Sequence, residues 1–209
     1  MIKVLLKQFT LFAFFISFFS NTYSQNFDID LLRKINLNRN TNLDGTMKLI
    51  SKTDGIIGVG MPVSVLLASY IEKDERLLEI GVNMTLALVA NTVNTQVMKQ
   101  IYNRKRPANT YPDIEAFDSD RRLSFPSGHA SIAFCTATSL TLNFPKWYVA
   151  IPSYAWASTV AYSRLHMGMH YPSDVLVGAL LGAGSAYVTF KANQYIKRYY
   201  YTKQIINMF

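Results

Sequence analysis

Hydrophobic residues fall in long, charge-poor stretches along this chain of 209 residues. After a short apolar run near the N-terminus there are five such stretches, at 55–71, 80–98, 130–144, 147–162 and 175–190. Each is long for a strand, and no alternating strand pattern or Asn-Gly hairpin signal competes with a helical interpretation. The pattern predicts an all-α fold, a bundle of about five to six helices.

The five stretches lie at the short end of the ~17–25 residues that a membrane span requires. Asn83, Asn91, Asn94 and Gln96 in the second stretch suit a helix that faces other helices. Gly178, Gly182 and Gly184 in the last resemble the small-residue contacts of membrane bundles. We therefore expect a membrane-spanning bundle, with a soluble secreted bundle as the alternative.

The N-terminus has the pattern of a secretory signal. Lys3 and Lys7 precede the apolar run 9–19, and small polar residues follow. We expect residues 1–24 to be a signal peptide cleaved after Ser24, which leaves a domain of residues 25–209. The alternative is an uncleaved first membrane anchor, and in either case the chain is exported or inserted.

The distribution of positive charge predicts an orientation. The C-terminal tail carries four cations and no acid: Lys191, Lys197, Arg198 and Lys203. If the cleaved N-terminus is exported, alternation places connections 72–77 and 145–146 and the tail in the cytoplasm, and connections 99–125 and 163–174 outside. The connection 99–125 is itself rich in Lys and Arg, against the positive-inside rule, so its cations need another reason. We expect a multi-pass protein of the cytoplasmic (inner) membrane with its active site at one end, facing the periplasm.

Composition and charge limit the classes of partner that the chain is expected to bind. Only 16% of residues are charged, against ~25% in soluble domains, and the formal charge is +8. There is no long Lys/Arg block or nucleic-acid fold signature, so an anionic membrane surface or a phosphorylated substrate is favoured over nucleic acid. The single cysteine, Cys135, lies in an apolar stretch and is expected to be a buried hydrophobe.

Three clusters of polar residues carry the candidate chemistry. They are Lys99-x6-Arg106-Pro107, Pro126-Ser127-Gly128-His129 and Ser163-Arg164-x5-His170-x3-Asp174. Each cluster alone is unspecific, but the eleven residues together resemble the signature of the type 2 phosphatidic acid phosphatase and vanadium haloperoxidase superfamily. The resemblance covers roughly residues 36–190, and the run 163–182 is more similar to the membrane-bound lipid phosphatases than to the soluble acid phosphatases.

The residues themselves suit a phosphate group. Lys99, Arg106 and Arg164 supply fixed positive charge, and guanidinium groups match phosphate oxygens. Gly128 permits a tight turn whose N–H groups face an oxyanion, and Ser127 adds a hydroxyl donor. Apolar helical stretches follow both histidine motifs, and helix N-termini favour phosphate.

The two motif histidines suit covalent catalysis. An imidazole is unprotonated near neutral pH, so His170 qualifies as a nucleophile, and Asp174 would hold one ring nitrogen. His129 would protonate the leaving oxygen and then activate water. The resemblance implies the same three roles, with Lys99, Arg106, Ser127, Gly128 and Arg164 as the phosphate-binding residues, and with no metal or other cofactor.

A metal site is the alternative for one of these histidines. His166 and His170 have the spacing of a helical metal pair. The sequence offers no third ligand, and Gly168 and Pro172 argue against one continuous helix.

The sequence therefore predicts a metal-independent phosphatase that acts on phosphomonoesters or pyrophosphates of membrane lipids through a phosphohistidine. Candidate substrates are phosphatidate, phosphatidylglycerol phosphate, undecaprenyl pyrophosphate and the phosphates of lipid A. The expected partners are the phosphorylated lipid and the surrounding membrane lipids, with no protein partner inferable. The alternatives are a soluble secreted acid phosphatase, a vanadate-dependent haloperoxidase and a non-catalytic scaffold.

Overall fold

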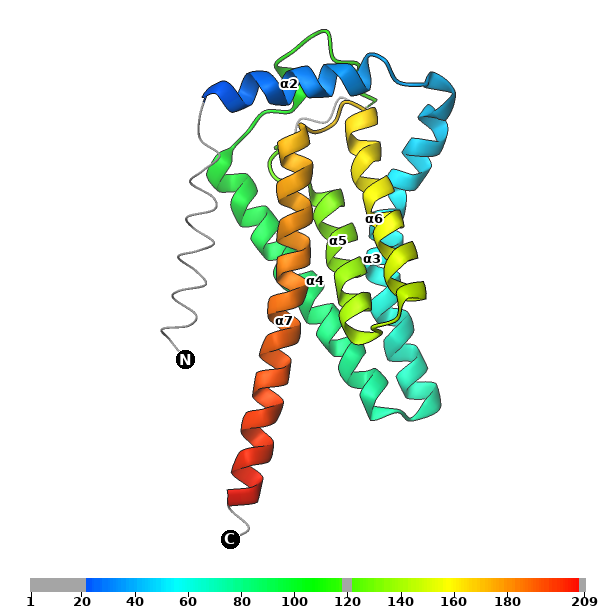
Figure 1. Cartoon of the computed structure of the whole chain (residues 1–209), viewed down its shortest axis with the longest axis vertical. Helices are drawn as coiled ribbons and strands as arrows, with labels where there is room; N and C mark the ends of the chain where they lie inside the picture. Colours follow the sequence, from blue (N-terminus) through cyan, green and yellow to red (C-terminus); the bar gives the residue numbers. More distant parts are fainter. Residues whose placement is uncertain (1–21, 118–121, 207–209) are drawn as a thin grey trace.

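The computed structural model describes residues 22–117 and 122–206, and all regular structure in these residues is helical (Figure 1). The helices are α2 (Thr22–Asn36), α3 (Asp44–Glu72), α4 (Glu75–Tyr102), α5 (Gly128–Asn143), α6 (Trp147–His166) and α7 (Pro172–Ile206), with short 3-10 turns η1 (Thr41–Leu43) and η2 (Pro107–Asn109). The predicted all-α bundle is confirmed. Each of the five apolar stretches falls in one helix and forms most of α3, α4, α5 and α6, but slightly less than half of α7.

Local sequence signals explain where these helices begin and end. Asp74 caps α4 by accepting a hydrogen bond from the Arg76 N–H at 2.7 Å. Lys73 and Asn103 adopt left-handed conformations, with φ of 53° and 44°, and terminate α3 and α4. Pro172 occupies the first position of α7, as expected, because proline needs no N–H partner there.

Helix α5 lies at the centre of the bundle and contacts α3, α4, α6 and α7. Its closest approach is to α7, where a Cβ on Gly178 would lie 2.5 Å from the Ser127 carbonyl oxygen and one on Gly182 would lie 2.0 Å from that of Ser131. The prediction of small-residue packing is thus confirmed for Gly178 and Gly182. It is wrong for Gly184, which faces open space.

Three helical segments of the described chain are long and apolar enough to cross a membrane: Thr41–Glu72, Glu75–Asn109 and Pro172–Tyr199. Their outward faces carry exposed apolar side chains at helical spacing, such as Ile56, Val59 and Val63 on α3 and Val89 and Val93 on α4. Apolar faces of this kind are stable in lipid rather than in water. The arrangement suggests a membrane protein rather than the alternative soluble bundle.

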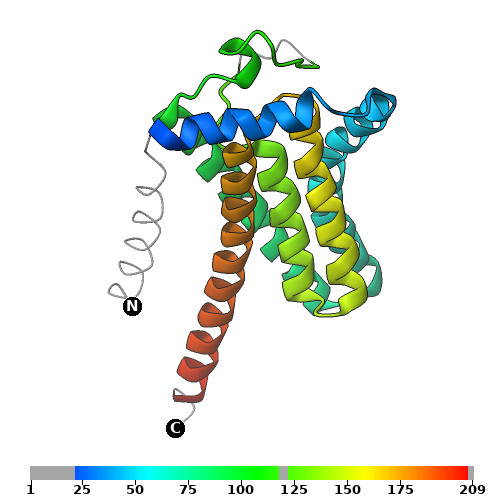
Figure 2. The same ribbon diagram turned by 45° about the horizontal axis from the view of Figure 1, so that its top comes forward.

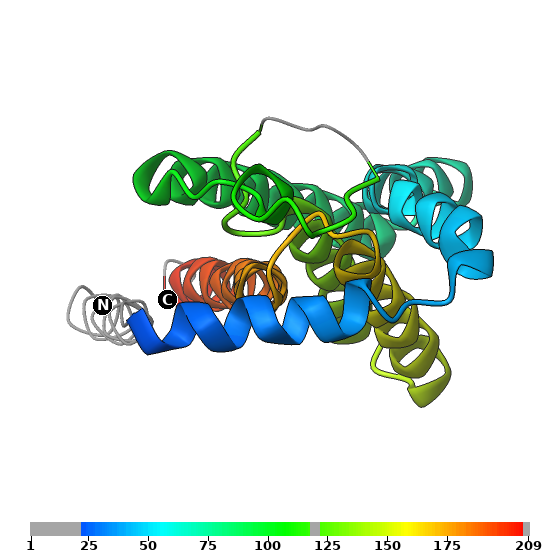
Figure 3. The same ribbon diagram turned by 90° about the horizontal axis from the view of Figure 1, so that it is seen from above.

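The two ends of the bundle differ in construction. Tight turns link α3 to α4 and α5 to α6 at one end, whereas α2 and the connecting segments 103–117, 122–127 and 167–171 lie at the other (Figure 2). Seen from above, α2 crosses this second end beside α6 and α7 (Figure 3). The expectation that the motif-bearing connections share one end is therefore confirmed.

Helix α2 was not among the predicted apolar stretches, because only one of its faces is buried. Asp28, Ile29, Leu32 and Asn36 point toward the bundle, and half of these are polar. The expected signal segment, residues 1–24, lies outside the described residues except for its last three, which open α2.

Candidate active site

The three sequence motifs meet where α2 covers the bundle. Lys99 lies in the last turn of α4, and Arg106 follows that helix. Ser127 caps α5, so His129 lies within the first turn of α5 rather than before it. Arg164 lies in the last turn of α6, while the connection to α7 carries His170.

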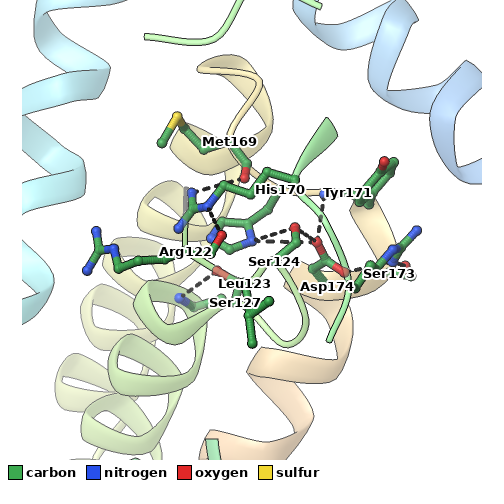
Figure 4. A network of polar contacts seen from close by, with 12 residues as sticks. Arg122, Leu123, Ser124, Ser127, Met169, His170, Tyr171, Ser173 and Asp174 are labelled. Atoms are coloured by element: carbon green, nitrogen blue, oxygen red, sulfur yellow. Dashed lines mark hydrogen bonds and ion pairs between the residues drawn. The ribbon is translucent and has the colours of Figure 1, made fainter. Parts of the chain in front are cut away.

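His170 and Asp174 form the buried centre of this end. The His170 side chain is 1% exposed and that of Asp174 is fully buried. Nδ1 of His170 lies 3.5 Å from Oδ2 of Asp174 and 3.4 Å from the Ser124 hydroxyl. Figure 4 shows the ring and the carboxylate facing each other with Ser124 beside both. The opposite ring nitrogen, Nε2, therefore points away from the carboxylate.

Asp174 is fixed by several donors. Its Oδ2 accepts hydrogen bonds from the Ser124 hydroxyl and, at 3.0 Å, from the Tyr171 N–H. Its Oδ1 accepts from Arg104 at 2.7 Å. A buried carboxylate needs such partners to remain charged, and here they also fix its orientation toward His170.

The network continues outward to α2. Arg104 donates to Asp28 Oδ2 at 2.7 Å, and its guanidinium lies 3.8 Å from the ring centroid of Tyr171. Asp28 also accepts from the Ser173 N–H at 2.8 Å. Asp28 thus connects α2 to the first turn of α7, the turn that contains Asp174.

Burial is the main influence on the basicity of His170. Desolvation, opposed by Asp174 and assisted by the charges of Arg164 and Arg106, lowers the pKa of His170 to about 4. The ring is therefore neutral at physiological pH, which is the form in which imidazole can act as a nucleophile.

The cations of the first motif organise the connection between α4 and α5. Lys99 Nζ donates to the Leu123 carbonyl at 2.8 Å, and Arg106 Nε donates to the Arg122 carbonyl at 3.0 Å. Arg106 also donates to the Met169 carbonyl at 3.2 Å, beside His170. These contacts hold positive charge next to the imidazole.

Arg164 joins this group from α6. Its guanidinium donates to the Ser51 hydroxyl of α3 at 2.6 Å, and Arg164 as a whole is 6% exposed. The charges of Arg164 and Arg106 act on both motif histidines, His129 and His170. The third motif thus adds a second buried guanidinium close to the two rings.

Two helix N-termini adjoin at this site. The Ser127 N–H, immediately before α5, donates to the Asp174 carbonyl in the first turn of α7 at 2.9 Å. The close contact of Gly178 with Ser127 holds the same two turns together. The N–H groups and dipoles of both helices favour an anion here.

His166 has a different environment from the metal pair considered above. Its Nε2 lies 2.7 Å from Asp44 Oδ1, and its carbonyl accepts from Asn36 at 2.9 Å. Within residues 22–117 and 122–206, no three His, Cys, Asp or Glu side chains gather as metal ligands. The geometry supports a structural role for His166, which joins α6 to the start of α3.

The sequence interpretation missed three polar residues of the network: Ser124, Arg104 and Asp28. Ser124 and Arg104 lie within a few positions of the motifs, and a search of motif neighbours would have found them. Asp28 precedes the first motif by some seventy positions, and only the fold brings it to the site.

Comparison with known proteins agrees with this arrangement. The family sequence model described as the PAP2 superfamily matches residues 77–198. The undecaprenyl-diphosphatase of Sulfolobus acidocaldarius is 32% identical over 89% of this chain and 88% of its own length. The lipid A 4'-phosphatase of Bacteroides thetaiotaomicron is 31% identical over 49% of this chain and 48% of its own length.

Two solved structures share the fold. The crystal structure of Aquifex aeolicus LpxE matches with a TM-score of 0.67 and 29% identity, covering 79% of this chain and 95% of that one. The PAP2-type phosphatidylglycerolphosphate phosphatase of Bacillus subtilis matches with a TM-score of 0.74 and 24% identity, covering 92% and 97%. Because the family match and the first relative each extend over most of the chain, this protein belongs to the PAP2 superfamily and is a membrane phosphatase of that family.

Proposed function

We propose that this phosphatase removes phosphate from membrane lipids through a phosphohistidine formed on His170. The observation that carries the proposal is the buried His170 ring, whose Nδ1 faces Asp174 while Arg106 and Arg164 lie close by. A neutral imidazole oriented by a carboxylate is the arrangement that nucleophilic catalysis needs.

In the first step, the Nε2 lone pair of His170 attacks phosphorus and the bond to the leaving oxygen breaks. Asp174 stabilises the positive charge that develops on the ring. Lys99, Arg106 and Arg164 balance the negative charge of the phosphate oxygens. Ser127 and the backbone N–H at Gly128 donate further hydrogen bonds to these oxygens.

His129 supplies the proton transfers in both steps. It protonates the leaving oxygen as the P–O bond breaks. It then takes a proton from the water that attacks the phosphohistidine, and the P–N electron pair returns to His170. The first step releases the protonated leaving group, and the second consumes one water and releases phosphate, which returns both histidines to their starting forms.

A lipid substrate follows from the position of the site. The site lies at one end of apolar helices, where the phosphate of an embedded lipid would lie beside α2. The names of the relatives include a polyprenyl diphosphatase and a lipid A phosphatase. The proposed substrates are accordingly lipid phosphomonoesters or pyrophosphates.

The proposed orientation places the site on the periplasmic face of the cytoplasmic membrane. Lys191, Lys197 and Arg198 lie far along α7 from its site end, and positive charge favours the cytoplasmic side. Asn109→Cys at the site end and Lys146→Cys at the other end test this, because the natural Cys135 is buried. A membrane-impermeant thiol reagent should label only Asn109→Cys in intact cells, and the reverse pattern would overturn the orientation.

A substrate panel tests the function. Purified protein in detergent is given phosphatidate, phosphatidylglycerol phosphate, undecaprenyl pyrophosphate, lipid A and water-soluble phosphomonoesters, with a chelator present. We expect phosphate release from at least one lipid, with a higher kcat/KM than for soluble esters. Release from soluble esters alone would contradict the lipid assignment, and loss of activity with chelator would contradict the histidine mechanism.

A further inference from the structure

The surroundings of His129 are strongly positive. The ring lies in the first turn of α5, where burial is the main factor that disfavours its protonated form and the charges of Arg164, Arg106 and Arg122 act in the same direction. Neighbouring cations disfavour a protonated imidazole. The general acid of the proposed mechanism must nevertheless carry a proton when the leaving group departs. The bound phosphate offsets part of this positive field, and a carboxylate beside the ring would offset more of it.

A buried carboxylate on α3 faces the same ring. Oδ1 of Asp54 lies 3.8 Å from Nε2 of His129, an ion-pair separation rather than a hydrogen bond. Asp54 is only 8% exposed, so its placement is costly unless opposite charge compensates it. Arg164 also interacts electrostatically with Asp54.

Packing fixes Asp54 toward the site. Ser51, three residues before it, accepts the hydrogen bond of Arg164, so this face of α3 lines the same group of side chains. Gly58, four residues after it, approaches α5 so closely that a Cβ there would lie 2.5 Å from the Ile132 side chain. Asp54 therefore lies on the face of α3 that packs against α5, the helix that carries His129.

We propose that Asp54 is the positioning carboxylate of His129, which stabilises the protonated ring as that ring protonates the leaving oxygen. The proposal rests on the proposed function. The site then contains two histidine–carboxylate pairs, one for the nucleophile and one for the acid. The second partner comes from α3, a helix that carries none of the three motifs. Asp54 acts through His129 and does not touch the reacting atoms.

Leaving-group dependence separates this role from a structural one. The leaving group of a long-chain alkyl phosphate is an alkoxide, which must be protonated as it departs. The leaving group of p-nitrophenyl phosphate is a stable phenolate, which hardly needs a proton. For Asp54→Asn we expect kcat/KM to fall ~10–100-fold with the alkyl phosphate, part of the ~10²–10⁴-fold that a general acid contributes. With the aryl phosphate we expect a loss of less than ~3-fold, because little acid catalysis remains to be lost.

The matched control is Asp44→Asn, the same substitution on the same helix at the partner of His166. This variant should lower thermal stability and leave the ratio of kcat/KM for the alkyl phosphate to kcat/KM for the aryl phosphate at the wild-type value. Asp54→Glu, which keeps the charge, should retain most of that ratio. Asp54→Ser removes the charge with a smaller side chain and repeats the test if the asparagine variant does not fold.

Equal losses on both substrates, or no loss on either, would overturn the role of Asp54 and leave the phosphatase itself intact. A wild-type protein that hydrolyses neither substrate, nor any lipid of the panel, would instead contradict the proposed function. The two failures are therefore distinguishable.

Discussion

Two buried histidines four residues apart, His166 and His170, each face an aspartate. The distance is 2.7 Å for His166 with Asp44 and 3.5 Å for His170 with Asp174. By distance alone, the His166–Asp44 pair would be the stronger candidate for a catalytic histidine–aspartate pair. Its surroundings are different, however, since Asp44 also pairs with Arg39 at 3.2 Å. The His166 pair joins α3 to α6.

The second pair is embedded in a larger arrangement. Asp174 is held by Ser124 and Arg104, and His170 lies within the influence of Arg106 and Arg164. A histidine–aspartate distance is therefore a poor guide to chemistry in this fold. What distinguishes a reactive pair is a carboxylate that is itself fixed and a group of cations that can hold the substrate.

Exchange of each histidine for alanine is the strongest test of this distinction. His170→Ala should lose ~10⁴-fold or more in kcat, because the nucleophile is removed. His166→Ala should lower the unfolding temperature and retain activity within ~10-fold, the range of a modest geometric change. Phosphate release and thermal unfolding of both variants provide the measurement. A fully active His170→Ala variant would eliminate the phosphohistidine.

The two aspartates give the next largest contrast. Asp174→Asn should lower kcat by ~10²–10⁴-fold, since an amide neither stabilises a charged ring nor fixes its tautomer. Asp44→Asn should leave kcat close to the wild-type value. The measurement is the amount of acid-labile phosphoprotein, which is the phosphohistidine, relative to acid-stable phosphoprotein after rapid quenching. Compared with the wild type, the phosphohistidine should diminish in Asp174→Asn and not in Asp44→Asn. Similar losses in the two variants would remove the distinction between the pairs.

The frame that holds the second pair can be tested at two glycines of α7. Gly178→Ala would press a Cβ against the Ser127 carbonyl and should cost ~10–100-fold in kcat, as expected for displacement of the site by a fraction of an ångström. Gly184→Ala, on the same helix but in open space, is the control and should be neutral or slightly stabilising. Equal activity of the two variants would show that the junction of α5 and α7 tolerates movement.

The smallest expected effect is that of pH. Because the pKa of His170 is lowered to about 4, its neutral form persists below pH 6, and kcat/KM should show no loss from His170 until the pH approaches that value. Asp174 opposes the lowering, so Asp174→Asn should move this acidic limit to still lower pH. Profiles of kcat/KM between pH 3.5 and 8, on folded protein, provide the measurement. An acidic limit near the ordinary histidine value of 6.5 would contradict the assignment.

Much of the bundle was predictable because helical apolar stretches are long and unambiguous. Each stretch became one helix, and Pro172 marked the start of α7. The motif-bearing connections meet at one end because the number of helices between them is even. Gly184 was assigned to a helix contact wrongly, since spacing alone does not say which glycine faces a neighbour.

The partners of the motif residues were less predictable. His129 has no carboxylate near it in sequence, and Asp54 reaches it only through the packing of α3 on α5. The same is true of Asp28, on a helix with one buried face. Sequence motifs thus indicate the groups that meet the substrate, while the groups that hold them come from distant segments and depend on tertiary structure.

The attachment of α2 through Asp28 has a consequence for biogenesis. Asp28 is synthesised before the rest of the bundle, yet its partners are Arg104 and Ser173. Contacts of such high sequence separation form late, after the intervening chain has been ordered. The support that Asp28 gives to Arg104 is therefore expected to form after most of the chain has been inserted. Because the contact of Arg104 with Asp28 completes the support of Asp174, we expect full catalytic activity to report the packing of α2 against the start of α7.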